Sequence, residues 1–108
     1  MSTPQDRRFE PRSSADARAV VVAPGLELSC LIIDRSRAGL RLRLDRSLAL
    51  PARVQVIDIA RAIALEAEVV WRKGQEAGLK QGGESSLRGL IPSRLSSARD
   101  AFLRAGGR

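Results

Sequence analysis

The sequence contains one cysteine, no histidine, no tyrosine and very few other aromatic residues. A single cysteine, Cys30, excludes an intramolecular disulfide, and one cysteine without histidine cannot form a zinc or iron–sulfur site. The same absences exclude Ser-His-Asp and Cys-His catalysis. Because no phosphate-binding loop or activated nucleophile is present either, we expect no metal, no cofactor and no enzymatic activity.

Long apolar runs are also missing. No run approaches the roughly 20 residues that a membrane helix needs, and the first twelve residues lack the apolar stretch of a secretory signal. We therefore expect a cytoplasmic protein without membrane insertion. Aromatic residues make up 3% of the chain, so its core must be built from Val, Leu, Ile and Ala. With 108 residues, the chain is the size of one ordinary domain.

Positive charge is abundant. The formal net charge is +7, and arginine supplies nearly all of the positive charge. This balance favours an anionic partner such as a nucleotide, a nucleic acid or a membrane surface. An arginine-rich solvated surface explains it equally well, because net charge informs association rather than fold. Charge alone leaves both interpretations open.

Residues 1–16 differ in composition from the rest. They are rich in charge and contain Pro4 and Pro11, and beyond Met1 their one large apolar side chain is Phe9. Such a segment cannot bury enough surface to offset its ordering entropy. The composition predicts a flexible N-terminal arm over residues 1–16 and one folded domain over residues 17–108.

Alternation of apolar and polar residues predicts six strands in that domain. The clearest alternation runs from Gly39 to Leu44, where leucines face inward and arginines outward. Turn signals such as Pro24-Gly25 separate the strands. The predicted strands are 17–22, 26–33, 39–44, 53–59, 63–71 and 76–80. We place Trp71 on the core side of its strand, and we interpret the Gly- and Ser-rich residues 81–86 as a loop.

The hydrophobic period changes near the C-terminus. Leu95, Ala98 and Phe102 recur at helical spacing and predict an amphipathic helix over about residues 93–105. Ser97 and Asp100 have the spacing of a capping box, and Gly106 suits a helix stop. The fold class is therefore mainly β, a small six-stranded antiparallel barrel or sandwich with a helix over one face or open end.

Two short motifs bear on function. Arg8 and Arg12 form an RxxxR pair, preceded by Arg7, and Asp34-Arg35-Ser36-Arg37-Ala38-Gly39 fits [DN]xSxxG. With 17 arginines, about 2.6 RxxxR pairs are expected by chance and three occur, so this motif alone is uninformative. The second motif is expected only about 0.05 times by chance.

In order and placement, the two motifs resemble the paired signature of the PilZ family. The arginine pair precedes the first predicted strand, and the second motif lies between the second and third. The resemblance implies a PilZ-like β-barrel with a C-terminal helix that binds cyclic di-GMP. It further implies that Arg8 and Arg12, assisted by Arg7, hold phosphate and base, and that the Asp34–Ser36–Gly39 turn fixes a guanine. Family members of this size usually act as adaptors that signal to a partner protein in motility, adhesion or exopolysaccharide control.

These residue types suit a cyclic dinucleotide. Arginine presents a planar fork to phosphate oxygens or to guanine O6 and N7, and it stacks on bases. Asp34 can accept hydrogen bonds from the donor edge of guanine, and Ser36 can both donate and accept. Gly39 permits either a positive φ or a close backbone approach. In the alternative interpretation, Asp34 and Ser36 form an ordinary Asx turn in which Gly39 supplies the left-handed residue.

Two other functions are compatible with the composition. A small basic β-barrel that binds single-stranded nucleic acid would use the outward Arg41 and Arg43, but such proteins stack bases on several exposed aromatic residues, so we regard nucleic acid as an unfavoured partner. The second alternative function is that of a PilZ-like adaptor that binds only protein. Every matched motif position is retained here, which disfavours that alternative.

Overall fold

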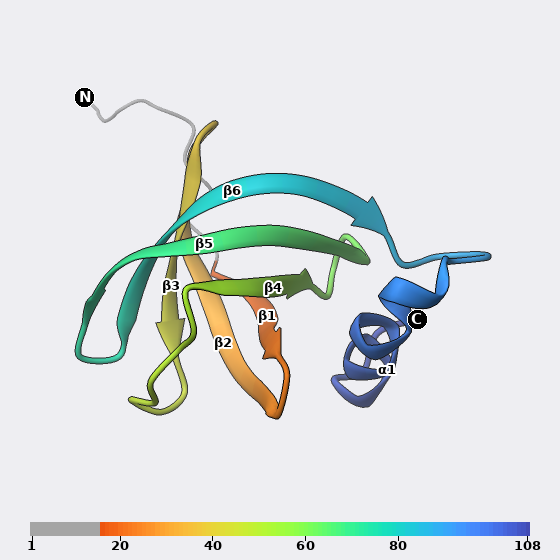
Figure 1. Ribbon diagram of the computed structural model, residues 1–108, viewed down its shortest axis with the longest axis horizontal. Helices are drawn as coiled ribbons and strands as arrows, with labels where there is room; N and C mark the ends of the chain where they lie inside the picture. The colour runs from red at the N-terminus through yellow and green to blue at the C-terminus, as the bar shows by residue number, and fades with distance from the viewer. Residues whose placement is uncertain (1–15) are drawn as a thin grey trace, which may run out of the picture.

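The computed structural model describes residues 16–108, which form six β-strands, a 3₁₀ turn and an α-helix (Figure 1). The elements are β1 (Ala17–Ala23), β2 (Leu26–Arg35), β3 (Gly39–Leu44), β4 (Arg53–Asp58), β5 (Ile63–Lys73), β6 (Glu76–Ser86), η1 (Ser93–Leu95) and α1 (Ser96–Arg104). The strands pair antiparallel and close a barrel in the order β1-β2-β3-β6-β5-β4. The predicted mainly-β fold with a C-terminal helix is confirmed.

The barrel interior is filled by aliphatic side chains, as the shortage of aromatic residues requires. On β3, Leu40, Leu42 and Leu44 are buried while Arg41 and Arg43 are exposed. The inward residues of the other strands complete the core on the same alternating pattern. The predicted inward and outward faces of β3 are therefore confirmed.

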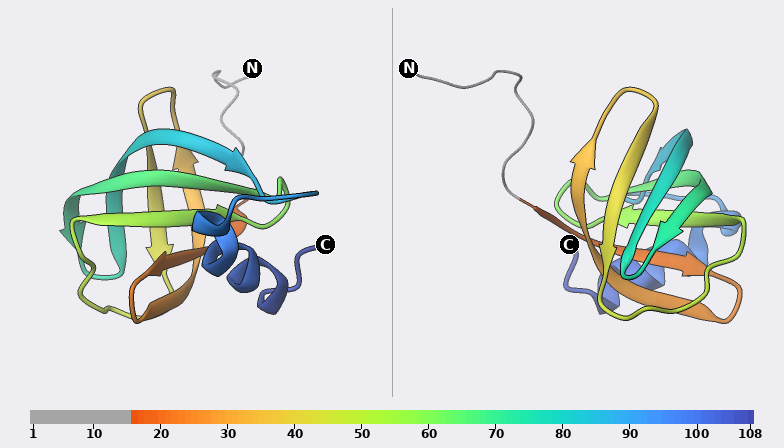
Figure 2. Two further views of the ribbon diagram at one scale, coloured as in Figure 1. Left: turned by 45° about the vertical axis from the view of Figure 1, so that its right-hand side comes forward. Right: turned by 90° about the vertical axis from the view of Figure 1, so that its left-hand side faces the viewer.

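A second core lies outside the barrel, beneath α1. The outward side chains Val20 of β1 and Ile57 of β4 pack there with Leu95, Ala98 and Phe102. The helix accordingly lies along one side of the barrel, so it covers a face and not an open end (Figures 1 and 2). Gly106 ends the helix with φ 97°, and it donates to the Leu103 carbonyl while Gly107 donates to that of Phe102. This is a Schellman arrangement, which confirms the predicted helix stop.

Two predictions about local structure are wrong. Residues 81–86 are not a loop, because β6 continues to Ser86 and pairs with β5 as far as Ile63. The capping box is not formed either. The 3₁₀ turn η1 follows Pro92, and the Ser96 N–H donates to the Ser93 carbonyl at its end. The helix α1 then begins at Ser96, and no side chain of this described segment caps its first turn.

The prediction that Trp71 faces the core is also wrong. Its side chain is 42% exposed, although Leu65 and Ala67 earlier on the same strand are buried. The register of β5 on β6 shifts between Val69 and Trp71. An irregularity of this kind breaks the alternation of faces, so the tryptophan side chain leaves the interior.

Candidate functional site

The second sequence motif occupies the β2–β3 hairpin, which projects from the barrel (Figure 2). The Ser36 N–H donates to the Gly39 carbonyl at 2.9 Å and closes the turn. The Gln81 N–H donates to the Ala38 carbonyl at 3.0 Å. The turn is thus closed within itself and tied to the neighbouring strand β6.

A register shift determines which way the motif side chains point. Up to Ile32, the even-numbered residues of β2 face the core, but the pairing with β3 shifts between Ile32 and Asp34. Beyond the shift, Asp34 lies opposite exposed Arg41 and Arg35 lies opposite buried Leu40. Because paired residues share a face of the sheet, the shift turns Asp34 outward and Arg35 toward the interior.

Gly39 is required by a close approach of two backbones. A Cβ atom at this position would collide with the carbonyl oxygen of Leu79 on β6. The described glycines with positive φ are Gly25, Gly74, Gly89 and Gly106, so Gly39 does not supply a left-handed residue. The alternative interpretation, in which Gly39 is the left-handed residue of an ordinary Asx turn, is therefore wrong.

The motif residues border a shallow cavity of about 230 Å³. Asp34, Ser36 and Gly39 line one side of this cavity, and Trp71 with Gly78 lines another. The indole of Trp71 rests on Gly78, where any Cβ would collide with the ring. An exposed aromatic ring beside hydrogen-bonding side chains offers a planar base both stacking and edge contacts.

Trp71 is the functional candidate that sequence reasoning missed. Its strand pattern places it inward, and only the register shift in β5 brings it out. One signal was available in the sequence: Gly78 follows across the short hairpin, and a glycine there leaves room for a large ring on its neighbour.

The surroundings of the cavity are cationic. Arg41 lines the cavity, and Arg37 lies exposed within the turn. Arg41 and Arg43 share one carboxylate, Glu76, at 4.0 and 3.7 Å. Exposed pairs this long are weak and easily exchanged for other anions. The hairpin surface is therefore electrostatically suited to phosphate.

The predicted arginines Arg7, Arg8 and Arg12 lie outside the described residues, as does the predicted arm except for Asp16. The structure does show where the chain joins the barrel. Ala17 pairs with Ile32, two residues before Asp34. Four residues lie between Arg12 and Ala17. The two Cα atoms are therefore five steps apart, and an extended segment of that length spans about 17 Å. Chain length therefore allows Arg12 to reach the cavity.

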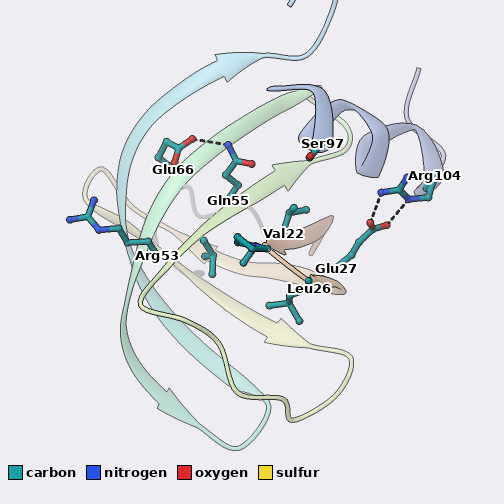
Figure 3. A pocket seen from close by; sticks show the side chains of 12 residues that line it. Val22, Leu26, Glu27, Arg53, Gln55, Glu66, Ser97 and Arg104 are labelled. Atoms are coloured by element: carbon teal, nitrogen blue, oxygen red, sulfur yellow. Dashed lines mark hydrogen bonds and ion pairs between the residues drawn. The ribbon is translucent and has the colours of Figure 1, made fainter. Parts of the chain in front are cut away.

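A larger cavity, of about 670 Å³, lies between the β1–β2 hairpin, β4 and α1 (Figure 3). Four of its polar or charged side chains interact with one another in two pairs. Arg104 donates to both Glu27 oxygens at 2.6 and 3.1 Å, and Gln55 donates to Glu66 at 2.8 Å. The hydrogen bond from Arg104 lowers the pKa of Glu27. Its described lining includes no residue of the β2–β3 motif.

No helix among residues 16–108 has the length and apolarity to cross a membrane. In the same range, no three or more His, Cys, Asp or Glu side chains are grouped so that they could hold a metal ion.

A closed β-barrel with a flanking helix and a cationic hairpin cavity defines a small ligand-binding domain. Comparison with protein-family models identifies which one: the model of the PilZ domain matches residues 6–91, so the chain belongs to the PilZ family. The matched segment contains both sequence motifs. PilZ domains are cyclic di-GMP receptors that act as ligand-binding adaptors and not as enzymes. No curated protein and no solved structure matches the chain.

Proposed function

We propose that this chain is a cyclic di-GMP receptor of the adaptor type, and that the dinucleotide binds between the arginine pair and the β2–β3 turn. One observation carries the proposal. The register shift in β2 directs Asp34 outward, to the cavity that Ser36, Gly39 and Trp71 also line. Hydrogen-bonding side chains from β2 and the β2–β3 turn thus border the same cavity as an aromatic ring from β5.

Each residue has a distinct role in this proposal. Asp34 accepts hydrogen bonds from the donor edge of one guanine, and Ser36 fixes its position. Trp71 supports the base by stacking. Gly39 admits the close packing of β3 on β6 that holds the turn in place. Arg41 attracts phosphate from the barrel side of the cavity.

The arginine pair completes the site. At about 230 Å³, the cavity is smaller than the 300–1,000 Å³ usual for ligand pockets, so the barrel covers only part of a dinucleotide. Arg8 and Arg12, assisted by Arg7, would close over the remainder as bidentate donors to phosphate and base. Engagement of this segment has an ordering cost, which charge-assisted hydrogen bonds offset.

The output of binding is a changed surface that a partner protein recognises. In this proposal the receptor acts in the cytoplasm and passes the second-messenger signal to a target in motility, adhesion or exopolysaccharide control. The chemistry is binding alone, and no residue is assigned a catalytic role.

The test is calorimetric titration of cyclic di-GMP at physiological salt into the wild type and three variants. Arg12→Ala and Ser36→Ala each remove charge-assisted or hydrogen-bonding contacts and should weaken binding about tenfold or more. Arg108→Ala is the matched control, because Arg104 and Arg108 form an RxxxR pair outside both motifs. Its affinity should equal that of the wild type.

Absence of wild-type binding would overturn the proposal. In that case, oligonucleotide binding with a steep salt dependence would identify a nucleic-acid barrel, since phosphate contacts release counterions. Absence of both activities would leave an adaptor that recognises protein only.

A further inference from the structure

Asp58 is the one polar or charged residue among the buried residues of the described chain, with 1% of its surface exposed. It ends β4, on the same face as Val54 and Val56, which point into the barrel. Its carboxylate therefore lies at one end of the barrel interior. A charge in that position is costly unless it is paired and hydrogen-bonded.

The partner of Asp58 comes from the ligand motif. Nη2 of Arg35 donates to Oδ2 of Asp58 at 2.9 Å, and the Arg61 N–H donates to Oδ1 at 3.3 Å. Arg35 stands between Asp34 and Ser36 in the turn motif. Its side chain reaches the carboxylate because the register shift in β2 turns it inward.

We propose that Asp58 is a positioning residue for the ligand turn, acting through Arg35. The expected effect on ligand affinity rests on the proposed function. The effect on the orientation of the turn does not depend on any ligand. Neighbouring residues of a strand point to opposite faces. Holding Arg35 inward therefore fixes Asp34 outward, at the cavity.

The buried carboxylate also selects between two registers. If the shift in β2 were lost, the alternation would place Asp34 inward and Arg35 outward, because a one-residue slip exchanges the faces. An inward Asp34 would then meet the negative charge of Asp58. Attraction to Arg35 and repulsion of Asp34 thus favour the same shifted register.

This ion pair differs from the others in the described part of the chain. The side chains of the other pairs are 34–59% exposed, so water and salt weaken them. Asp58 has a side-chain exposure of 1%, and its interactions are screened far less. It alone among these pairs joins the ligand motif to the interior of the barrel.

The first experiment needs no ligand. Hydrogen exchange is measured in wild type and in Asp58→Asn, which keeps the shape and removes the charge. Exchange at Ser36 and Gln81, whose N–H groups hold the turn, should accelerate about tenfold or more relative to Leu42 in the same barrel. Glu27→Gln is the matched control, since it neutralises an exposed arginine-bound carboxylate elsewhere. It should leave the turn unchanged.

The second experiment measures cyclic di-GMP affinity and separates positioning from stability. The double variant Arg35→Met/Asp58→Leu removes both charges, and such replacements often preserve stability. It should fold and still bind about tenfold or more weakly, because nothing selects the outward Asp34. Phe102→Leu, which loosens the separate core under α1, should bind within about twofold of wild type once folded.

A double variant that binds as tightly as wild type, or unchanged turn exchange in Asp58→Asn, would overturn the positioning role. The two proposals fail separately. If the wild type does not bind cyclic di-GMP, the proposed function falls, while the exchange experiment still decides whether Asp58 positions the turn.

Discussion

At the scale of single residues, Gly39 tests how closely the ligand turn is packed on the barrel. A methyl group there would meet the Leu79 carbonyl oxygen, a backbone atom held in the β3–β6 pairing. Backbone cannot move aside as the end of a flexible side chain does. We expect Gly39→Ala to lower the free energy of unfolding by about 1–3 kcal/mol, as measured by urea denaturation.

Gly83→Ala is the control for that experiment. Gly83 lies on β6, has no positive φ, and has no atom within 4 Å of the position that a Cβ would take. Its replacement should change stability by no more than about 0.5 kcal/mol. Equal losses from both variants would show that close approach at Gly39 is not the cause.

The positions of some candidate-site residues are determined by nearby sequence, and those of others by strand pairing between distant parts of the chain. Asp34, Ser36 and Gly39 were predictable because they form one short motif between two strands. The exposure of Trp71 and the pairing of Arg35 with Asp58 were not predictable. Each depends on a register shift between strands, and such a shift arises from pairing across the barrel and not from local alternation.

At the scale of elements, the largest buried side chain that packs α1 against the barrel is that of Phe102. Phe102 is 1% exposed in the core between α1, β1 and β4, while its neighbour Leu103 is 50% exposed. Phe102→Ala should lower the free energy of unfolding by about 3–5 kcal/mol, a large share of the 5–15 kcal/mol typical of a domain.

Leu103→Ala removes an apolar side chain from a partly exposed position on the same helix. Because that side chain is already half in water, the loss should stay below about 1 kcal/mol. Thermal unfolding of the two variants beside wild type makes the comparison. A large loss from Leu103→Ala would mean that this face of α1 is covered in solution.

Element boundaries were predictable where the local pattern is strong. The bounds of β3 follow from its strict alternation, and the helix from its period and its glycine stop. The second half of β6 was not predictable, because residues 81–86 are Gly- and Ser-rich and form a strand only through pairing with β5. Pairing with a long neighbouring strand outweighs weak local propensity.

At the scale of the whole molecule, Cys30 reports on opening of the barrel. It lies in the interior core, and burial raises the pKa of its thiol from the ordinary 9.0 to about 12, with a smaller contribution from the charge of Asp45. The folded state thus disfavours the thiolate. Stability linked to this group is fully present below pH 9 and declines as pH rises from 9 toward 12.

The same burial makes thiol labelling a measure of ligand binding to the folded barrel. At pH 8 a thiol reagent reacts with Cys30 in opened molecules, because in the folded barrel burial both shields the thiol and raises its pKa. Cyclic di-GMP that binds the closed barrel alone should slow labelling by one plus the ratio of free ligand to Kd, about 100-fold at 100 times Kd. The rate is followed by absorbance of the released chromophore. Arg12→Ala, with binding weakened about tenfold or more, should reduce the protection to about 11-fold or less at the same ligand concentration, whereas Arg108→Ala should retain it. Protection in Arg12→Ala equal to that of the wild type would place the ligand at a site that does not need the arginine pair.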